Sequence, residues 1–288
     1  MLDFLINLQK IDRRWVYLFV FAACTFPFAV KIWLPLYTSP ETRGVYETVD
    51  KCPPDKVVLV DSSWDAGSMG ENKGQVEVVF DHMLRNGTKF IVTAQNVPLA
   101  PQFSEAAIEA LVNGKYKDRH YKYGEQWVNL GVTIAADYII MQQIAQKDGL
   151  HRQYPKDYRG TPVGQLPLMK TARDLSDIYM IHAVTYTPSE NWLAFIHGPY
   201  GTPITFGCAG IQSTTYYRYV TSGQINGMLV GIRGSAEYDA MLYPNDMKAR
   251  KSLGSRLIVP LAFGHVVIIL AIVIGNIGYF AGGRRRMQ

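Results

Sequence analysis

The longest uninterrupted apolar stretch of the chain lies close to its C-terminus. Residues 257–281 include no Asp, Glu, Lys or Arg, and Arg284, Arg285 and Arg286 follow after two glycines. A helix that crosses a bilayer needs about 20 mainly apolar residues at a rise of about 1.5 Å each. The pattern therefore predicts a transmembrane helix at residues 256–282 and a basic tail at 283–288. The alternative is a buried core helix of a soluble domain.

A second apolar run near the N-terminus predicts another transmembrane helix at residues 15–37, after a short segment at 1–14. This run is interrupted by Pro27 and Lys31, although a lysine near a helix end can extend its ammonium to the membrane surface. Aromatic residues lie near both ends of the run, as they do at the two surfaces of a bilayer. A cleavable signal peptide is the competing interpretation.

Two spans would place both termini on one side of the membrane and residues 38–255 on the other. Basic residues beside both termini favour a cytoplasmic location for them, but residues 248–256 also carry basic side chains on the domain side. Long domains translocate largely regardless of their own charge. We therefore expect an integral protein of a prokaryotic inner or plasma membrane, with the domain on the extracytoplasmic side and in contact with membrane lipid.

Within the domain, short apolar runs alternate with segments of helical periodicity. The periodicity predicts strands at 56–60, 89–93, 127–132, 177–184 and 202–207, and helices at 40–50, 75–85, 103–112, 135–146, 189–197 and 214–222. An apolar, glycine-punctuated run at 225–232 and an amphipathic segment at 236–242 follow, and residues 148–174 form a long polar excursion.

Strands that alternate with helices are typical of right-handed βαβ units and a parallel sheet. We expect an α/β domain of the Rossmann-like or flavodoxin-like class with a mostly parallel sheet, flanked by one N-terminal and one C-terminal transmembrane helix. Such domains bind ligands at the carboxyl ends of their strands. The loops after the predicted strands are therefore the default place to look for a binding cleft.

The loop after the first predicted strand carries the most suggestive chemistry. The candidate ligand cleft comprises Asp61, Ser62, Ser63, Asp65, Gly67 and Cys208. Carboxylate and hydroxyl oxygens suit Mg²⁺, and glycines allow backbone amides to approach a phosphate. The loop matches neither the dinucleotide-binding nor the P-loop motif, however, and Asp, Ser and Gly are also ordinary turn residues.

Cys208 could act as a thiol nucleophile if His182 or His197 lay beside it as a base. A small thiol packed between glycines is equally compatible with a buried structural residue, and a histidine inside an apolar strand with a hydrogen-bonded core residue. Cys52 and Cys208 could form a disulfide in an oxidising compartment or remain separate thiols. His265, inside the C-terminal span, is a candidate functional group because it is ionisable, but a neutral imidazole that is hydrogen-bonded to a neighbouring helix is a sufficient explanation. The histidine spacing predicts no metal site.

Two aromatic and glycine-rich segments are candidate interfaces. Tyrosine and arginine are common at protein contacts, and small residues let membrane helices approach closely. The candidates are Tyr216, Tyr217, Arg218, Tyr219 and Arg233 in the domain, with Gly275 and Gly278 in the C-terminal span. Packing within the domain is the alternative for the tyrosines.

The net charge of +5 comes from basic residues clustered beside the apolar runs, so nothing indicates nucleic-acid binding. We also find no cofactor motif and no catalytic signature.

The segments S-G-Q-x-x-G and G-x-x-E-Y within residues 222–242, with residues 157–166 before them, carry one resemblance. The chain resembles a group of prokaryotic membrane-anchored proteins with an α/β domain. This group is not assigned to a named functional family. The likeness implies a prokaryotic source and the anchored architecture, and it assigns no functional residue.

These features together predict a non-catalytic structural or accessory subunit of a membrane protein assembly. Its tethered domain would dock other membrane-protein subunits or copies of itself, as a homo- or hetero-oligomer. The alternative is a ligand-binding or enzymatic domain that uses the cleft near Asp61, Asp65 and Cys208.

Overall fold

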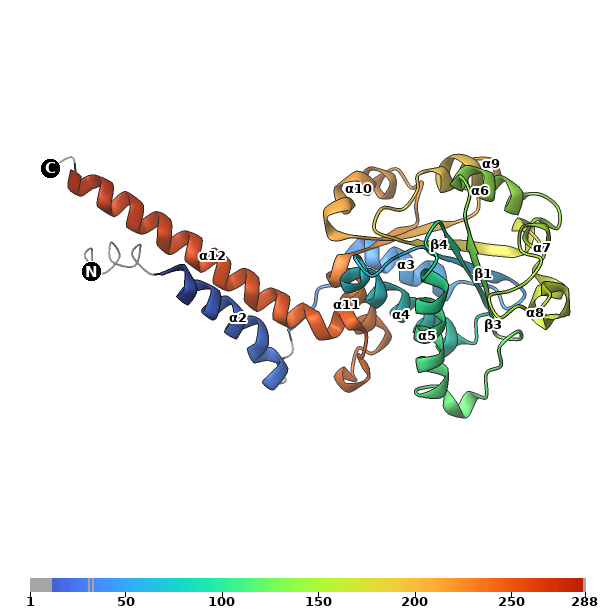
Figure 1. The fold of residues 1–288 in the computed structure, drawn as a ribbon, viewed down its shortest axis with the longest axis horizontal. Coiled ribbons are helices and arrows are strands. Elements are labelled where there is room, and N and C mark those ends of the chain that lie inside the picture. The colour runs from blue at the N-terminus through green and yellow to red at the C-terminus, as the bar shows by residue number, and fades with distance from the viewer. Residues whose placement is uncertain (1–11, 31, 33, 287–288) are drawn as a thin grey trace. The chain divides into compact units, whose positions relative to one another are not determined.

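The computed structural model describes residues 12–30, 32 and 34–286. The chain divides into two compact units. One is the domain Leu36–Ser255, and the other combines the helical segments that precede and follow it (Figure 1).

The domain contains a six-stranded, entirely parallel sheet in the order β3-β2-β1-β4-β5-β6. The strands are β1 (Val57–Ser62), β2 (Phe90–Gln95), β3 (Trp127–Thr133), β4 (Ile178–Val184), β5 (Ile204–Cys208) and β6 (Gly227–Val230). This order is that of a Rossmann-like doubly wound sheet, in which the direction of winding reverses between the first and fourth strands. The predicted α/β class with a parallel sheet is confirmed.

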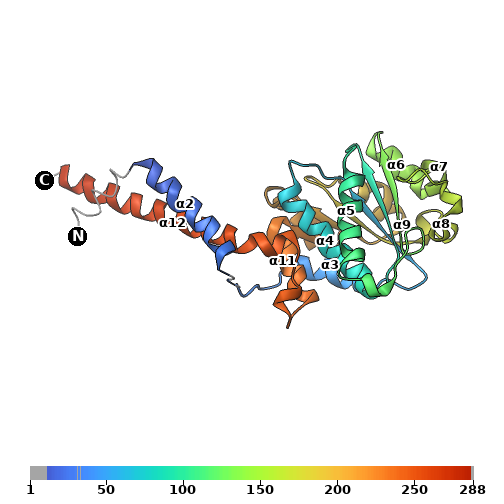
Figure 2. The ribbon, with the colours of Figure 1, turned by 60° about the horizontal axis from the view of Figure 1, so that its bottom comes forward.

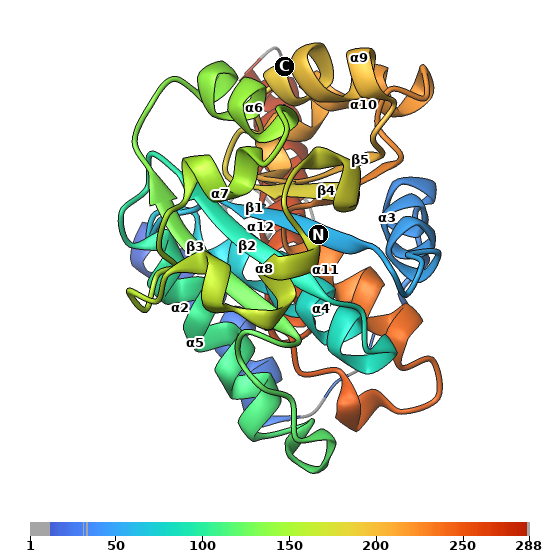
Figure 3. The ribbon, with the colours of Figure 1, turned by 90° about the vertical axis from the view of Figure 1, so that its right-hand side faces the viewer.

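Helices cover both faces of the sheet (Figure 3). One face carries α3 (Pro40–Asp50), α4 (Met69–Asn86), α5 (Ala100–Asn113) and α11 (Gly231–Leu242). The other carries α6 (Asp137–Ala145), α7 (Gly149–Gln153), α8 (Pro167–Thr171), α9 (Gly198–Tyr200) and α10 (Ser213–Thr221). Figure 2 shows α4 and α5 as neighbours.

Each face has its own apolar core because side chains alternate along every strand. Along β1, Val57 and Leu59 belong to the core under α6–α10, whereas Val58 and Val60 belong to the core under α4. All six residues of β1 are buried. This explains the continuous apolar runs in the sequence, since a parallel sheet is covered on both faces.

Local sequence signals account for several helix ends. The Ser39 hydroxyl accepts a hydrogen bond from the Thr42 amide at the start of α3, and Pro40 occupies its first turn. Gly87 ends α4 in the left-handed conformation, with φ of 74°. The predicted bounds of α3 are confirmed. The predicted loop at 61–70 is shorter, because Asp61 and Ser62 complete β1 and α4 already begins at Met69.

The glycine-punctuated run at 225–232 contains a sixth strand, β6, that the sequence pattern did not separate from its surroundings. Its glycine serves a close approach to α3: a Cβ at Gly227 would lie 2.4 Å from the Val45 nitrogen, and one at Gly44 would lie 2.0 Å from the Asn226 oxygen. The backbones of α3 and β6 therefore touch where any side chain would separate them.

Both ends of the domain are fastened to α11. The Glu237 carboxylate accepts hydrogen bonds from the Ser39 amide at 2.9 Å and from its hydroxyl at 2.8 Å. The Asp239 carboxylate accepts from the Ser252 amide at 3.1 Å and from the Ser255 hydroxyl at 2.7 Å. The chain therefore enters and leaves the domain through neighbouring positions on one helix.

The second unit pairs α2 (Arg13–Ala29) with most of α12 (Leu253–Arg286). The rings of Phe26 and Phe263 lie 6.2 Å apart, and a Cβ at Gly264 would lie 3.0 Å from the Cys24 sulfur. The His265 ring bonds the Leu261 carbonyl of its own helix at 2.8 Å.

Among the described residues, one helix is long and apolar enough to cross a membrane: α12 over Leu253–Phe280, 28 residues. The 17 residues of α2 would span about 25 Å, short of a hydrocarbon core of about 30 Å. The predicted pair of transmembrane helices is therefore supported only for the C-terminal one. The helix predicted at 15–37 ends at Ala29, and residues 31 and 33 lie outside the described part of the chain.

Candidate functional site

The switch point between β1 and β4 is where a sheet of this order binds its ligand. It is bordered by the carboxyl ends of these two strands, with residues 63–68 after β1 and the segment after Val184 of β4. The candidate cleft residues of the first loop lie here.

Asp61 is a buried carboxyl group at this point, 4% exposed. Its Oδ1 accepts a hydrogen bond from the Ser63 hydroxyl, and its Oδ2 accepts from Trp192 Nε1 at 3.3 Å and from Gln95 Nε2 at 3.4 Å. Burial raises the pKa of Asp61 to about 7, although the bonds from Ser63 and Trp192 act against this rise. Near neutral pH the group is therefore divided between its acid and its carboxylate.

Two tryptophan side chains close the sheet edge around Asp61. The Trp192 indole, 1% exposed, lies in the core under α6–α10. On the opposite face Trp64, also 1% exposed, donates to the Ser62 hydroxyl at 2.9 Å and stacks on Phe103 at 5.1 Å. The end of β1 is thus covered on both faces by the protein's own side chains.

The first turn of α4 is occupied by a carboxylate. Glu71 Oε2 accepts from the Gly210 amide at 2.6 Å, and a Cβ at Gly231 would lie 2.6 Å from the same oxygen. In dinucleotide-binding domains the helix after the first strand presents its N-terminus to phosphate. Here Glu71 places negative charge at that position, which disfavours a phosphate ligand.

Gln75, one turn further along α4, joins the ends of the last two strands. Its Nε2 lies within hydrogen-bond distance of the carbonyl oxygens of Cys208, Leu229 and Gly231, at 2.9, 3.2 and 3.1 Å. This buried amide, with two N–H donors for these three carbonyl oxygens, fastens α4 to the strand ends.

The remaining cleft candidates are not gathered around Asp61. Asp65 is exposed and accepts from the Ser68 amide at 3.0 Å, as a turn residue does, and Gly67 is exposed beside it. Cys208 is buried, and its sulfur lies 3.8 Å from the Leu229 carbonyl. Burial, with the nearby Glu71, raises the pKa of the Cys208 thiol to about 12, so it remains protonated.

The histidines considered as bases have other partners. His182 Nδ1 lies 2.8 Å from the Thr205 hydroxyl, and burial lowers the pKa of His182 to about 3. His197 Nδ1 lies 3.0 Å from the Thr202 carbonyl. Cys52 and Cys208 are both free thiols. Over residues 12–30, 32 and 34–286, no group of three or more His, Cys, Asp or Glu side chains could hold a metal ion.

The candidate interface residues divide between core and surface. Tyr216 is buried and donates to the Pro188 carbonyl at 2.6 Å, whereas Tyr217 is 41% exposed. Arg218 pairs with Glu190 at 3.0 Å and lies over the Tyr219 ring. Arg233 pairs with the buried Glu237 at 2.5 Å. In α12, Gly275 is exposed and Gly278 is buried.

A surface feature that the sequence did not reveal lies along the same edge of the sheet. Large apolar side chains are exposed in the segments after four of the strands, and we call this set the strand-end rim: Leu99, Ile134, Tyr138, Ile139, Tyr186 and Ile211. Ile134 is 74% and Ile211 is 75% exposed. Isolated apolar residues in polar loops were the available signal, but only the fold brings them to one edge.

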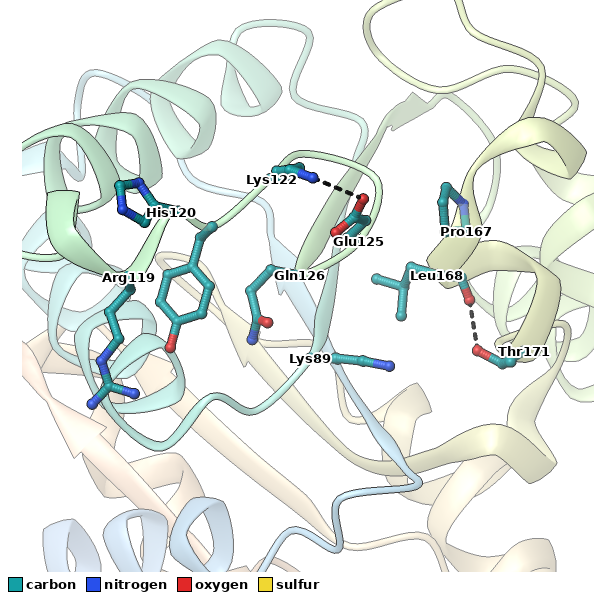
Figure 4. Close-up of a pocket in the computed structure, with 10 residues that line it drawn as sticks. Lys89, Arg119, His120, Lys122, Glu125, Gln126, Pro167, Leu168 and Thr171 are labelled. Carbon is teal, nitrogen blue, oxygen red and sulfur yellow. Dashed lines mark hydrogen bonds and ion pairs between the residues drawn. The ribbon is translucent and has the colours of Figure 1, made fainter.

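A pocket of about 460 Å³ lies at the opposite, amino-terminal edge. Its walls come from the residues that precede β2 and β3, from the turn after α5 and from α8 (Figure 4). The lining is rich in cations, with Lys89, Arg119 and Lys122, and it includes one carboxylate, Glu125.

Comparison with family models, with curated proteins and with solved structures finds no match. The resemblance of residues 222–242 to prokaryotic membrane-anchored proteins therefore stays a prediction.

Proposed function

We propose that this chain is a non-catalytic structural subunit of a membrane assembly, whose tethered domain docks onto a second copy through the strand-end rim. The observation that carries the proposal concerns the carboxyl edge of the sheet. The switch point on this edge is covered by buried side chains, while large apolar side chains beside it are exposed. Asp61 is covered by tryptophans where related folds hold a ligand, while Ile134 and Ile211 point to solvent on the same edge.

The charges beside the rim favour a copy of the chain over a strongly charged partner. Asp137 is held by Ser189 and by Asn191, the latter at 3.0 Å, and Glu190 pairs with Arg218. Arg218 offsets the charge of Glu190, and neutral side chains hold Asp137 within the domain. The exposed apolar side chains of the rim suit association with an identical surface.

Tethering strengthens such weak contacts. We propose that α12 crosses the membrane, that the segment containing α2 provides the second anchor, and that the domain lies on the extracytoplasmic side. Confinement to a membrane raises the effective concentration of one domain for another.

Photo-crosslinking in intact membranes tests the docking surface. A photoreactive amino acid at Ile211 should give an adduct of twice the chain's mass of 32.4 kDa. The same amino acid at Met247, which is 45% exposed in the turn after α11 and outside the rim, is the matched control and should give none. An adduct with a different protein would refute self-association, and the absence of any adduct would refute docking at the rim.

One observation favours the alternative of a ligand-binding or enzymatic domain. A buried carboxyl group with a pKa of about 7 is a common feature of catalytic sites. Asp65 and Cys208 do not contact it, however, so the alternative would rest on Asp61 with Ser63 and Gln95. Opening of Trp192 away from Asp61 on ligand binding, measured by tryptophan fluorescence, would support it.

A further inference from the structure

We propose that the pocket at the amino-terminal edge of the sheet binds a small, water-soluble molecule that carries a phosphate group. The pocket lies on the edge opposite the strand-end rim, because Lys89 directly precedes β2 and Gln126 directly precedes β3. A ligand there would leave the proposed docking edge free.

The charge of the lining selects an anion. Lys89, Arg119 and Lys122 contribute three positive charges against the single carboxylate of Glu125. Glu125 lies 3.7 Å from Lys122, and both side chains are more than half exposed. An exposed pair of this kind contributes little and is easily rearranged.

Two of the cations are unpaired among the residues that the structure describes. Within the part of the chain that the structure describes, neither the Lys89 ammonium nor the Arg119 guanidinium makes a hydrogen bond or an ion pair, whereas Lys115, Arg159 and Arg173 elsewhere in the domain are each paired with carboxylates. Arginine and lysine around a hollow provide the donors that phosphate oxygens accept, and the guanidinium can bind two oxygens at once.

The walls between these cations are already fixed. Tyr121 donates its hydroxyl proton to the Leu84 carbonyl at 2.7 Å, and Gln126 donates its amide to the Thr88 carbonyl at 2.8 Å. On the side of α8, Thr171 donates to the Leu168 carbonyl at 2.9 Å. Figure 4 shows Lys89 and Gln126 between Arg119 on one side and the α8 residues Leu168 and Thr171 on the other.

The size of the pocket suits a phosphorylated metabolite better than a free ion alone. Ligand pockets commonly measure about 300–1,000 Å³, and this one measures about 460 Å³. Leu168 and Pro167 provide an apolar wall beside the cations. The lining therefore combines anion recognition with a surface for the remainder of the molecule.

Binding of inorganic pyrophosphate to the full chain, in nanodiscs of zwitterionic lipid and measured by calorimetry at low ionic strength, tests this proposal. The double variant Lys89→Gln/Arg119→Gln should weaken binding by about tenfold or more, because it removes two cations that donate charge-assisted hydrogen bonds to phosphate oxygens. The matched control is Arg43→Gln/Lys147→Gln, which removes the same charge from exposed positions outside the pocket and should leave the affinity unchanged.

A gain-of-binding variant separates a specific pocket from damage to the fold. Glu125→Gln removes the one carboxylate and releases Lys122, so it should tighten pyrophosphate binding by about twofold to fivefold. The proposal is overturned if the wild-type chain does not bind pyrophosphate, if the control pair loses as much affinity as the pocket pair, or if Glu125→Gln weakens binding.

Discussion

The variant Asp61→Asn should change how the stability of this protein depends on pH. The Asp61 carboxyl group is buried, and its pKa of about 7 lies far above that of an aspartate in the unfolded chain, about 3.9. Between about pH 4 and pH 7 the folded state therefore holds a proton that the unfolded state has released. Stability falls as the pH rises through this window, and the loss is complete above pH 7.

The size of the effect follows from the pKa difference. A rise of about three units corresponds to about 4 kcal/mol, at 1.36 kcal/mol per unit. Asparagine has a similar shape and does not ionise, so this pH-dependent loss should disappear in the variant. On going from pH 4 to pH 8, the difference in free energy of unfolding between the two proteins should shift by about 4 kcal/mol in favour of the variant.

Urea unfolding of the full chain in mild detergent, followed by near-UV circular dichroism across this pH range, measures the shift. Asp65→Asn is the matched control, because it makes the same chemical change at an exposed position of the same loop and keeps the bond from the Ser68 amide. Its pH profile should run parallel to that of the wild type. Parallel profiles for Asp61→Asn as well would refute the conclusion that this carboxyl group is buried and protonated.

Three further substitutions test the packing. Trp192→Ala should destabilise the domain by about 3–5 kcal/mol, because it opens a cavity beside Asp61. Denaturant midpoints measure this loss, and a cost under 1 kcal/mol would contradict the conclusion that Trp192 covers this edge of the sheet. Gly227→Ala should cost about 1–3 kcal/mol, because its Cβ would meet the Val45 nitrogen; a higher melting temperature would contradict that contact. Asp239→Ala should lower the free energy of unfolding by about 1–3 kcal/mol and speed amide hydrogen exchange at Ser252, because the Ser252 amide loses its acceptor. Unchanged exchange at Ser252 would show that this hydrogen bond does not hold the end of the domain.

Much of the sheet could be predicted from the sequence because most of the buried strands are continuous runs of apolar, often β-branched residues. The run of β-branched residues in β1 and the capping residues around α3 are local signals, and the structure bears them out. The strand β6 was harder, since it is only four residues long and begins with Gly227, which weakens the strand pattern. Gly227 is needed at this position because the strand packs closely against α3, about 180 residues earlier. A sequence pattern read over a short segment does not include a contact between such distant residues.

The sequence indicated which edge of the sheet to examine, but it did not indicate which side chains cover that edge. A polar loop that follows a buried strand pointed to the carboxyl edge of the sheet, which is where domains of this class bind ligands, and Asp61 lies at that edge. What covers it depends on Trp192, which is 131 positions away in the chain. The rim was missed for the same reason, because Leu99, Ile134 and Ile211 are ordinary loop residues until a parallel sheet aligns the loops that carry them.

The length of the N-terminal helix was overestimated. The apolar run from Trp15 onward continues past Ala29, but Val30 adopts extended geometry and ends the helix. Composition alone does not record where a helix stops when the residues that follow it are also apolar. The C-terminal helix has no such break, which is why its prediction was the more accurate of the two.

Native mass spectrometry of the full chain released from its own membranes determines whether the domain docks onto a second copy through the strand-end rim. We expect assemblies at whole multiples of 32.4 kDa that dissociate in the rim variant Ile134→Asp/Ile211→Asp and persist in the off-rim control Met247→Asp. A single species at 32.4 kDa from the wild-type membranes, or assemblies that the rim variant leaves intact, would contradict it.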